Sequence, residues 1–125
     1  MKKKVLIIED ENDLRFFIAR ALKEEGFEVI EAFDGEEGME KAKKEKPDLI
    51  LLDLLLPGIS GYEVLTRIKK DPELEMIPVL ILSNLGQQEE IERGLKLGAI
   101  DYLIKANFTL DEIVDRIKKI LYSPK

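Results

Sequence analysis

Short apolar segments alternate with helical patterns along the whole chain. The apolar segments span residues 5–8, 27–30, 49–52, 79–82 and 100–104. Uninterrupted aliphatic runs such as those at 5–8 and 49–52 are typical of strands buried on both faces of a parallel sheet. Between the segments, apolar residues recur every three or four positions, as they do on the buried face of a helix. The pattern therefore predicts five strands, each followed by a helix.

Each predicted helix has an apolar stripe, and most have a recognisable end. Glycine commonly follows the last turn of a helix, and proline stops a helix. Thr109 and Glu112 form a predicted capping box at the start of the fifth helix. The expected ends of the first four helices are Gly26, Pro47, Asp71-Pro72 and Gly98. The five stripes are Leu14, Phe17, Ile18, Ala21 and Leu22; Gly38, Met39 and Ala42; Leu65 and Ile68; Ile91 and Leu95; and Leu110, Ile113, Val114, Ile117 and Leu121.

This alternation predicts an α/β fold with a parallel sheet. Strands joined by helical crossovers must run parallel, with right-handed connections and helices on both faces of the sheet. Five such units occupy 125 residues, so we expect a single domain over residues 1–125. Residues 123–125 carry no pattern of a further domain, which is compatible with a stand-alone protein or with a part of a longer one.

The composition is that of a folded acidic domain without cysteine or histidine. Hydrophobic residues make up 45% of the chain, which argues against disorder. No apolar run reaches the roughly 20 residues of a membrane span, and the N-terminus lacks a signal-peptide pattern, so we expect a cytoplasmic protein. The formal net charge of −6 argues against nucleic-acid binding by this domain. The absence of histidine excludes a histidine phosphocarrier or a histidine-based triad within this chain.

Polar side chains stand at the ends of four predicted strands. Glu9 and Asp10 follow the first strand, Asp53 the third, Ser83 the fourth and Lys105 the fifth. Singly, each has an ordinary explanation as a cap, turn or surface residue. In parallel sheets, however, ligands bind outside the carboxyl ends of the strands, so we expect these residues to converge there. Crowded buried acids are costly without a cation, and the pattern therefore predicts a divalent metal site with one acid free to react.

At these positions the chain resembles the response-regulator receiver domain, the phospho-acceptor half of two-component signalling. The resemblance rests on Glu9-Asp10, Asp53 in the segment 53–58, Ser83, and Tyr102 with Lys105. It spans essentially the whole chain. It implies a flavodoxin-like, doubly wound (βα)5 fold with strand order 2-1-3-4-5.

The predicted chemistry centres on Asp53. A carboxylate can attack a phosphoryl group to give an acyl phosphate, a step that needs positioning and charge neutralisation more than proton transfer. Asp10 and Asp53 are expected to bind Mg²⁺ directly and Glu9 through water, since oxygen ligands with retained waters suit this ion. The resemblance adds the backbone carbonyl of Leu55 as a ligand. It also implies a sensor histidine kinase or a phosphotransfer protein as the phosphoryl donor.

A switch is expected to follow from the added charge. Lys105, Ser83 and Asn84 are predicted to contact the phosphoryl oxygens. Movement of Ser83 would shift the loop 83–88, and in the family the aromatic residue at the position of Tyr102 then rotates into the space beneath that loop. The surface of the fourth helix, fifth strand and fifth helix changes shape and serves a downstream effector or a second copy of the chain. Phosphorylation acts by favouring one of two pre-existing states.

Several positions depart from the family pattern. Asn84 stands where the family usually has alanine. Ala106 replaces a proline that usually makes a cis peptide; since a cis bond without proline costs about 3 kcal/mol, we expect the Lys105–Ala106 peptide to be trans. Leu55 and Leu85 stand where polar groups usually place the hydrolytic water, which predicts a slowly hydrolysing phosphoryl group.

Phe16 is a candidate docking residue on the first helix. An exposed aromatic side chain there would dock on a kinase helix pair, as the corresponding helix does in the family, although single exposed apolar residues are also commonplace. The spacing places Phe16 opposite Leu14, Phe17 and Ile18 and beside Ala19, Arg20 and Lys23.

Three alternatives to a phosphorylated switch stay open at this stage. A small Mg²⁺-dependent phosphohydrolase would use Asp53 as its nucleophile, but no acid stands two residues later to activate water. A flavodoxin-like cofactor protein would need a phosphate-binding loop after the first strand, which the chain lacks. A degenerate receiver would bind partners without phosphorylation, and Asn84 and Ala106 favour that alternative. The receiver interpretation makes the chain a signalling switch rather than an enzyme.

Overall fold

Residues 2–122 are described by the computed structural model; Met1 and the predicted tail at 123–125 lie outside the described residues. The strands form one parallel sheet in the order β2-β1-β3-β4-β5, which confirms the predicted flavodoxin-like topology. The strands are β1 (Lys4–Ile8), β2 (Glu28–Ala32), β3 (Leu49–Leu52), β4 (Val79–Ser83) and β5 (Asp101–Ile104). The helices are α1 (Asn12–Glu24), α2 (Gly35–Glu45), α3 (Gly61–Lys70), α4 (Gln88–Lys96) and α5 (Leu110–Tyr122), and a short 3₁₀ helix, Lys105–Asn107, follows β5.

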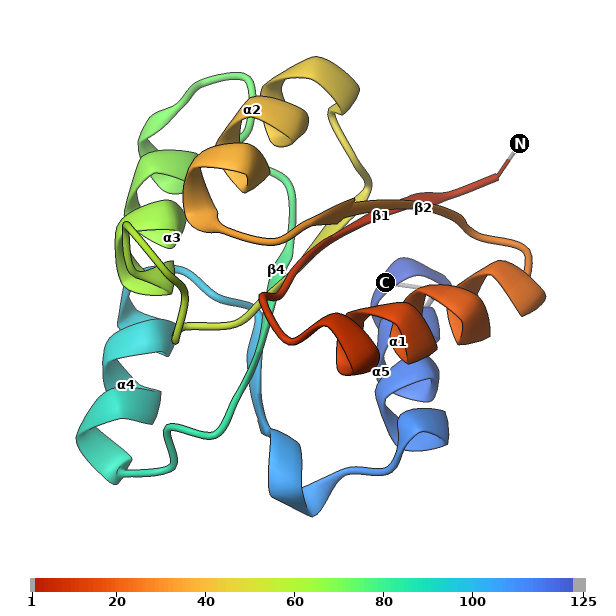
Figure 1. The fold of residues 1–125 in the computed structure, drawn as a ribbon. Helices are drawn as coiled ribbons and strands as arrows, with labels where there is room; N and C mark the ends of the chain where they lie inside the picture. The colour runs from red at the N-terminus through yellow and green to blue at the C-terminus, as the bar shows by residue number, and fades with distance from the viewer. Residues whose placement is uncertain (1, 123–125) are drawn as a thin grey trace.

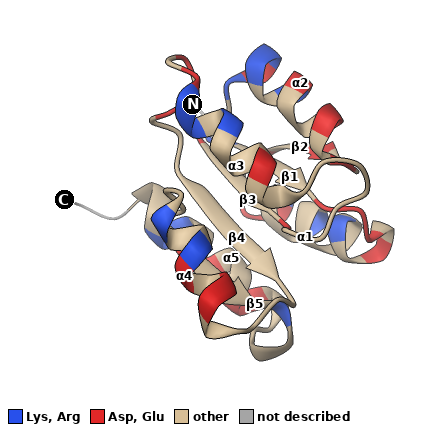
Figure 2. Cartoon of the chain, turned by 90° about the vertical axis from the view of Figure 1, so that its left-hand side faces the viewer, with Lys and Arg blue, Asp and Glu red and all other residues tan. Residues whose placement is uncertain are grey.

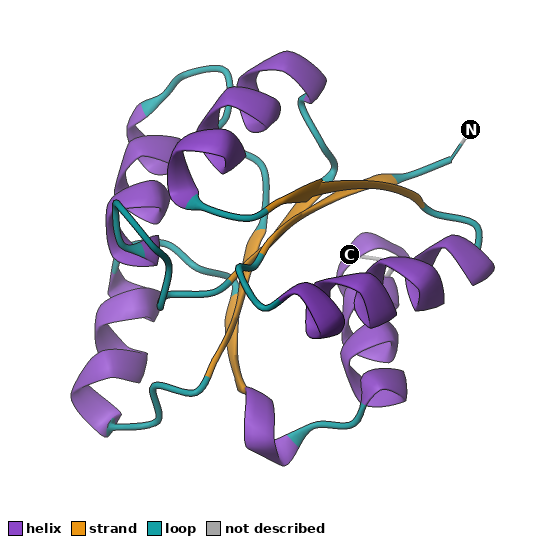
Figure 3. Ribbon diagram, in the orientation of Figure 1, coloured by secondary structure: helices purple, strands orange, loops and turns teal. Residues whose placement is uncertain are grey.

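The helices cover the sheet in two layers. Helices α1 and α5 lie on one face, and α2, α3 and α4 lie on the other (Figures 1 and 3). Alternate residues of β1 serve the two layers, because successive side chains of a strand point to opposite faces. Leu6 and Ile8 belong to the core under α2 and α3, whereas Val5 and Ile7 belong to the core under α1 and α5. The apolar runs at 5–8 and 49–52 are therefore in strands buried on both faces, as predicted.

Most charged residues lie on the outer surfaces, and Glu9 and Asp53 are buried. Figure 2 shows acidic and basic residues interspersed along the helices, while β4 contains neither. Many of the charges are paired, as between Arg67 and Glu63 on successive turns of α3. Among residues 2–122, no helix is both long and apolar enough to cross a membrane.

The predicted helix ends are well reproduced. Gly26 after α1 and Gly98 after α4 have φ values of 94° and 114°, the left-handed conformation that glycine adopts at little cost. At the start of α5, the Glu112 N–H donates to Thr109 Oγ1 over 3.2 Å and the Thr109 N–H donates to Glu112 Oε1 over 2.8 Å. The predicted capping box is thus present.

The second strand ends two residues later than predicted. The prediction of 27–30 placed Phe27 in a strand, but β2 spans Glu28–Ala32. The Phe27 N–H donates to Leu22 O as part of the turn that ends α1, so this group is not available to the sheet. Pairing of Lys4 with Glu28 then sets where β2 begins.

The stripes of α1 and α4 also differ from the prediction. Phe17 was expected in the core and Ala19 at the surface, but Phe17 is 52% exposed and Ala19 is buried. The buried face of α1 is centred on Ile18 and Leu22, and a helix turns about 100° per residue, so Phe17 falls outside that face. Leu95 was likewise predicted to be buried in α4 and is exposed.

Candidate functional site

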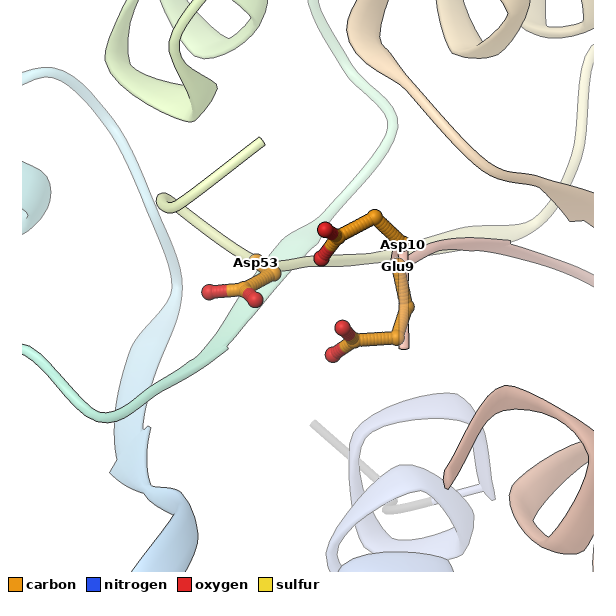
Figure 4. Close-up of side chains that lie close together, drawn as sticks. All are labelled: Glu9, Asp10 and Asp53. Atoms are coloured by element: carbon orange, nitrogen blue, oxygen red, sulfur yellow. The ribbon is translucent and has the colours of Figure 1, made fainter. Parts of the chain in front are cut away.

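Three carboxylates meet at the carboxyl edge of the sheet, as Figure 4 shows. Glu9 and Asp10 follow β1, and Asp53 follows the neighbouring strand β3. Backbone hydrogen bonds continue the sheet into this region, because the Asp53 N–H donates to Ile8 O and the Glu9 N–H donates to Ala32 O, both over 3.0 Å. One oxygen from each of the three carboxylates lies within 4.8 Å of the others. The predicted convergence of the acids is therefore present.

The acids differ sharply in their exposure to solvent. Glu9 is 3% exposed and Asp53 is 4% exposed, whereas Asp10 is exposed. Burial raises the pKa of the Glu9 carboxyl, although hydrogen bonds from Lys105 and from the Glu11 N–H oppose that rise. Glu9 Oε2 accepts from the Glu11 N–H over 3.0 Å, and Asp53 Oδ1 accepts from the Leu55 N–H over 3.1 Å. The two buried carboxylates are thus fixed in orientation, and Asp10 faces the solvent.

Lys105 supplies the positive charge that these acids require. It begins the 3₁₀ helix after β5, and its Nζ lies 2.8 Å from Glu9 Oε1 and 2.9 Å from Asp53 Oδ2. Burial by itself would lower the pKa of Lys105, but the hydrogen bonds to Glu9 and Asp53 outweigh it and raise that pKa. The Lys105 ammonium group is therefore charged near neutral pH and ties β5 to β1 and β3.

Ser83 and Asn84 lie at the end of β4, beside the end of β5. Ser83 is fully buried and pairs in register with Ile104, the residue before Lys105. Its Oγ accepts from the Leu85 N–H over 3.4 Å, and the side chain of Asn84 is exposed. The sheet thus brings Ser83 to the edge that carries the acids.

The Tyr102 side chain lies beneath the loop that precedes α4. The side chain is buried, and its hydroxyl donates to Leu85 O. The ring fits there because Gly94 of α4 has no side chain; a Cβ at this position would lie 3.2 Å from the Tyr102 ring. Burial is also the main reason why the pKa of Tyr102 rises to about 12. The rotation of Tyr102 on phosphorylation, which the resemblance implies, stays a prediction.

The positions that depart from the family pattern are readily located. The Lys105–Ala106 peptide is trans, as predicted, and the described residues contain no cis peptide bond. Leu55 is 53% exposed at the rim of the site, and Leu85 is partly buried beside Tyr102. Both leucines therefore present apolar groups close to the acids or to the loop after β4.

The docking candidate Phe16 is exposed, as predicted, but it has a neighbour. Phe16 is 56% exposed, and its ring lies 5.7 Å from the ring of Phe17, which is similarly exposed. The exposed aromatic surface of α1 is therefore a pair of rings rather than a single residue.

Sequence reasoning missed one residue of this region, Arg15. Its guanidinium group contacts the backbone of Glu9, and it lies on the face of α1 that turns toward the sheet. The available signal was an arginine six residues after the first acid and one helical turn before the buried Ile18 and Ala19. Neither Glu9 nor Asp10 caps α1, because the cap residue is Glu11. The ordinary explanation of these two acids as helix caps is therefore wrong.

A cluster of acids bridged by a buried lysine at the carboxyl edge of a five-stranded parallel sheet is typical of a receiver-type signalling domain, and comparison with known proteins agrees. The sequence pattern of the response regulator receiver domain matches residues 5–118, and the chain belongs to this family. The chain is 38% identical over 125 residues to the phosphate regulon transcriptional regulatory protein PhoB of Rhizobium meliloti (strain 1021), covering 100% of this chain and 55% of that protein. The chain thus spans about half the length of this curated relative.

Solved structures give the same result. The receiver domain of the Francisella response regulator 1452 has a TM-score of 0.87 and 35% identity, covering 97% of each chain. The phosphorylated cyanobacterial phytochrome response regulator RcpA has a TM-score of 0.88 and 35% identity, covering 98% of this chain and 96% of that chain. The protein is therefore the receiver domain of a two-component response regulator, a signalling switch, and the alternative functions gain no support from these matches.

Proposed function

We propose that Asp53 accepts a phosphoryl group from a histidine of a partner kinase or phosphotransfer protein. In this step a carboxylate oxygen of Asp53 bonds to phosphorus, the phosphorus–nitrogen bond of the phosphohistidine breaks, and the imidazole leaves with the bonding electron pair. The observation that carries the proposal is the buried Asp53 carboxylate held between Lys105 Nζ at 2.9 Å and the Leu55 N–H at 3.1 Å. Such fixed positioning and charge neutralisation are what phosphoryl transfer demands.

The donor set fits a hard divalent cation such as Mg²⁺. Asp10 and Asp53 would hold it directly, Glu9 would act through water, and the Leu55 carbonyl would complete the protein ligands. The exposed Asp10 leaves an open side toward solvent, where the ion can keep water and meet a phosphate. When bound, Mg²⁺ supplies positive charge for the phosphoryl oxygens. Lys105 remains a second positive charge on the same acids.

The phosphoryl group is expected to be long-lived. The side chains of Leu55 and Leu85 offer no hydrogen bond to an attacking water, and the exposed side chain of Leu55 lies at the rim of the site. Hydrolysis of the acyl phosphate needs a positioned water, so apolar side chains here slow it. A half-life of seconds for the Mg²⁺-bound phosphoprotein would contradict this expectation.

The output surface is the face formed by α4, β5 and α5. Contact of Ser83, Asn84 and Lys105 with the phosphoryl oxygens would draw the loop after β4 toward Asp53. Tyr102 and Leu85 are joined by a hydrogen bond, so that movement reaches β5 and α4. A downstream effector, or a second copy of the receiver domain at 1–125, would bind the altered surface. We expect this interaction to take place in the cytoplasm.

The decisive experiment is intact-mass measurement after incubation with acetyl phosphate and Mg²⁺. We expect one added phosphoryl group on the parent and on Asp111→Asn, an exposed acid of α5, and none on Asp53→Asn. Chelation of Mg²⁺ should abolish the label. A parent chain without the label would favour a degenerate receiver, and a label that persists in Asp53→Asn would refute the assignment of the acceptor.

Docking of a kinase is expected at Phe16 on α1. Phe16→Ala should slow phosphoryl transfer from a phosphorylated histidine kinase while leaving labelling by acetyl phosphate unchanged, because the small donor needs no docking surface. Tyr122→Ala, which removes another exposed aromatic side chain, serves as the control. Equal kinase transfer rates in the parent and in Phe16→Ala would contradict the docking proposal.

A further inference from the structure

Arg15 of α1 connects three elements next to the acidic site. Its Nη1 donates to the backbone carbonyl of Glu9 over 2.6 Å, its Nε donates to Glu31 Oε1 over 3.2 Å, and its Nη2 donates to Asn12 Oδ1 over 2.7 Å. The Arg15 side chain is only 16% exposed, far less than is usual for arginine. One guanidinium group thus joins the end of β1, the edge strand β2 and the first residue of α1.

The contact with Glu9 involves a particular peptide group. The carbonyl of Glu9 belongs to the peptide that links Glu9 to Asp10, where the chain leaves the sheet and turns into α1 (Figure 1). A buried carbonyl that leaves a strand needs a new donor, and Arg15 provides it. Because a peptide group is planar, fixing this carbonyl also fixes the direction in which the chain enters Asp10.

Asp10 needs such support more than the other two acids do. Glu9 is held by Lys105 and the Glu11 N–H, and Asp53 is held by Lys105 and the Leu55 N–H. Within residues 2–122, the Asp10 carboxylate has no hydrogen-bond partner. Its position therefore depends on the backbone that carries it.

We propose that Arg15 is a positioning residue of the divalent-cation site: it holds the Glu9–Asp10 peptide so that Asp10 is oriented for the ion before the ion arrives. The inference deepens the proposed function and rests on it. Arginine suits this role because its rigid fork donates in several fixed directions at once, which lysine cannot do. Outer partners that orient metal ligands typically change metal affinity by roughly 10- to 100-fold when they are removed.

A positioning role and a simple charge effect of Arg15 predict opposite changes in Mg²⁺ affinity when the residue is replaced. The Arg15 guanidinium is positive, so its charge alone repels a cation, and removing that charge would tighten Mg²⁺ binding. Loss of positioning instead weakens binding. Lysine at this position keeps the charge and loses the fork, whereas glutamine loses both.

The test is the dissociation constant of Mg²⁺, measured by isothermal titration calorimetry on the unphosphorylated chain well below its unfolding temperature. We expect Arg15→Lys and Arg15→Gln both to weaken binding by roughly tenfold or more. The control is Arg20→Gln, an exposed arginine of the same helix that pairs only with Glu24 within the described residues and makes the same change of charge. It should stay within about twofold of the parent.

Each outcome separates the possible explanations. Unchanged binding in Arg15→Lys, or tighter binding in Arg15→Gln, would overturn the positioning role while leaving the proposed site intact. A parent chain that fails to bind Mg²⁺, or that binds it equally well as Asp10→Asn, would overturn the proposed site and this inference together. Weaker binding in both Arg15 variants, with unaltered circular dichroism, supports it.

Discussion

Replacement of Lys105 by methionine removes the cation that bridges Glu9 and Asp53. Methionine keeps much of the length of the lysine stem and leaves the two buried carboxylates without their shared partner. Both carboxylates are within 3 Å of Nζ and almost fully buried. Removing one partner of a buried ion pair typically costs about 3–5 kcal/mol, because the remaining charge is uncompensated. We therefore expect the free energy of unfolding to fall by about that amount at pH 7 without Mg²⁺.

Urea unfolding followed by circular dichroism is the suitable assay, since the chain contains no tryptophan. The matched control is Lys118→Met, which breaks a Lys118–Glu25 pair of 2.6 Å whose side chains are exposed. Exposed pairs contribute about 0–1 kcal/mol, so this variant should lose little stability. Its behaviour separates the effect of burial from the effect of simply losing a lysine.

The pH dependence gives a second signature of the same cause. Burial already raises the pKa of Glu9, and losing Lys105 removes an interaction that lowers it, so the folded pKa rises further above the ordinary 4.5. A carboxyl whose pKa is raised by folding is protonated below its unfolded pKa and costs the fold no stability there. As the pH rises through its folded pKa the group becomes charged, and the free energy of unfolding falls. The deficit of Lys105→Met should therefore shrink on acidification toward pH 4 and shrink on adding Mg²⁺. A loss no larger than that of Lys118→Met, or one that neither acid nor Mg²⁺ relieves, would refute the reasoning.

Three further predictions concern the switch region and a helix cap. Gly94→Ala should lower the free energy of unfolding in urea by about 1–3 kcal/mol, because the new Cβ would lie 2.7 Å from Ile81 Cδ1. Alanine is preferred over glycine in helices by about 1 kcal/mol, so a gain in stability of that size would show that the site tolerates the added methyl group and would contradict this prediction. The pKa of Tyr102 is raised to about 12, so its contribution to the free energy of unfolding is fully present below pH 10 and falls by about 2–3 kcal/mol as the pH approaches 12. Urea unfolding at alkaline pH should show this fall in the parent and not in Tyr102→Phe. Ser60→Ala should cost about 1 kcal/mol in thermal unfolding, because Ser60 Oγ accepts from the Glu63 N–H at the start of α3, and Ser60→Asn should restore it.

The fold was predictable because its signals are local and repeated. Fully apolar runs such as 49–52 mark strands covered on both faces. The glycines after α1 and α4 mark helix ends where the backbone takes the left-handed conformation, which glycine adopts at little cost. The edge strand β2 was placed less well, since its half-exposed sequence alternates and its register depends on pairing with β1. Tertiary pairing of that kind is invisible to a local pattern.

The candidate site was predictable in its members and less so in its contacts. Parallel strands deliver their ends to one edge, so Glu9, Asp53 and Lys105 had to come close once the sheet was predicted. Arg15 escaped notice because its role depends on the rotation of α1 about its axis, and the placement of Phe17 in the core was wrong for the same reason. A small rotation of α1 about its axis moves one residue into the core and another out of it, and the amino-acid sequence of the helix alone does not reveal that rotation.

The hydrogen bond between Tyr102 and Leu85 ties strand β5 to the loop after β4. The ring is buried and its hydroxyl donates to a backbone carbonyl of that loop, so neither part shifts far without the other. A change at the carboxyl edge that displaces the loop is therefore expected to carry the ring with it, and each 1.4 kcal/mol of preference between two such arrangements changes their ratio tenfold. Tyr102→Phe keeps the ring but removes the hydroxyl, so it should let the loop move while β5 stays in place.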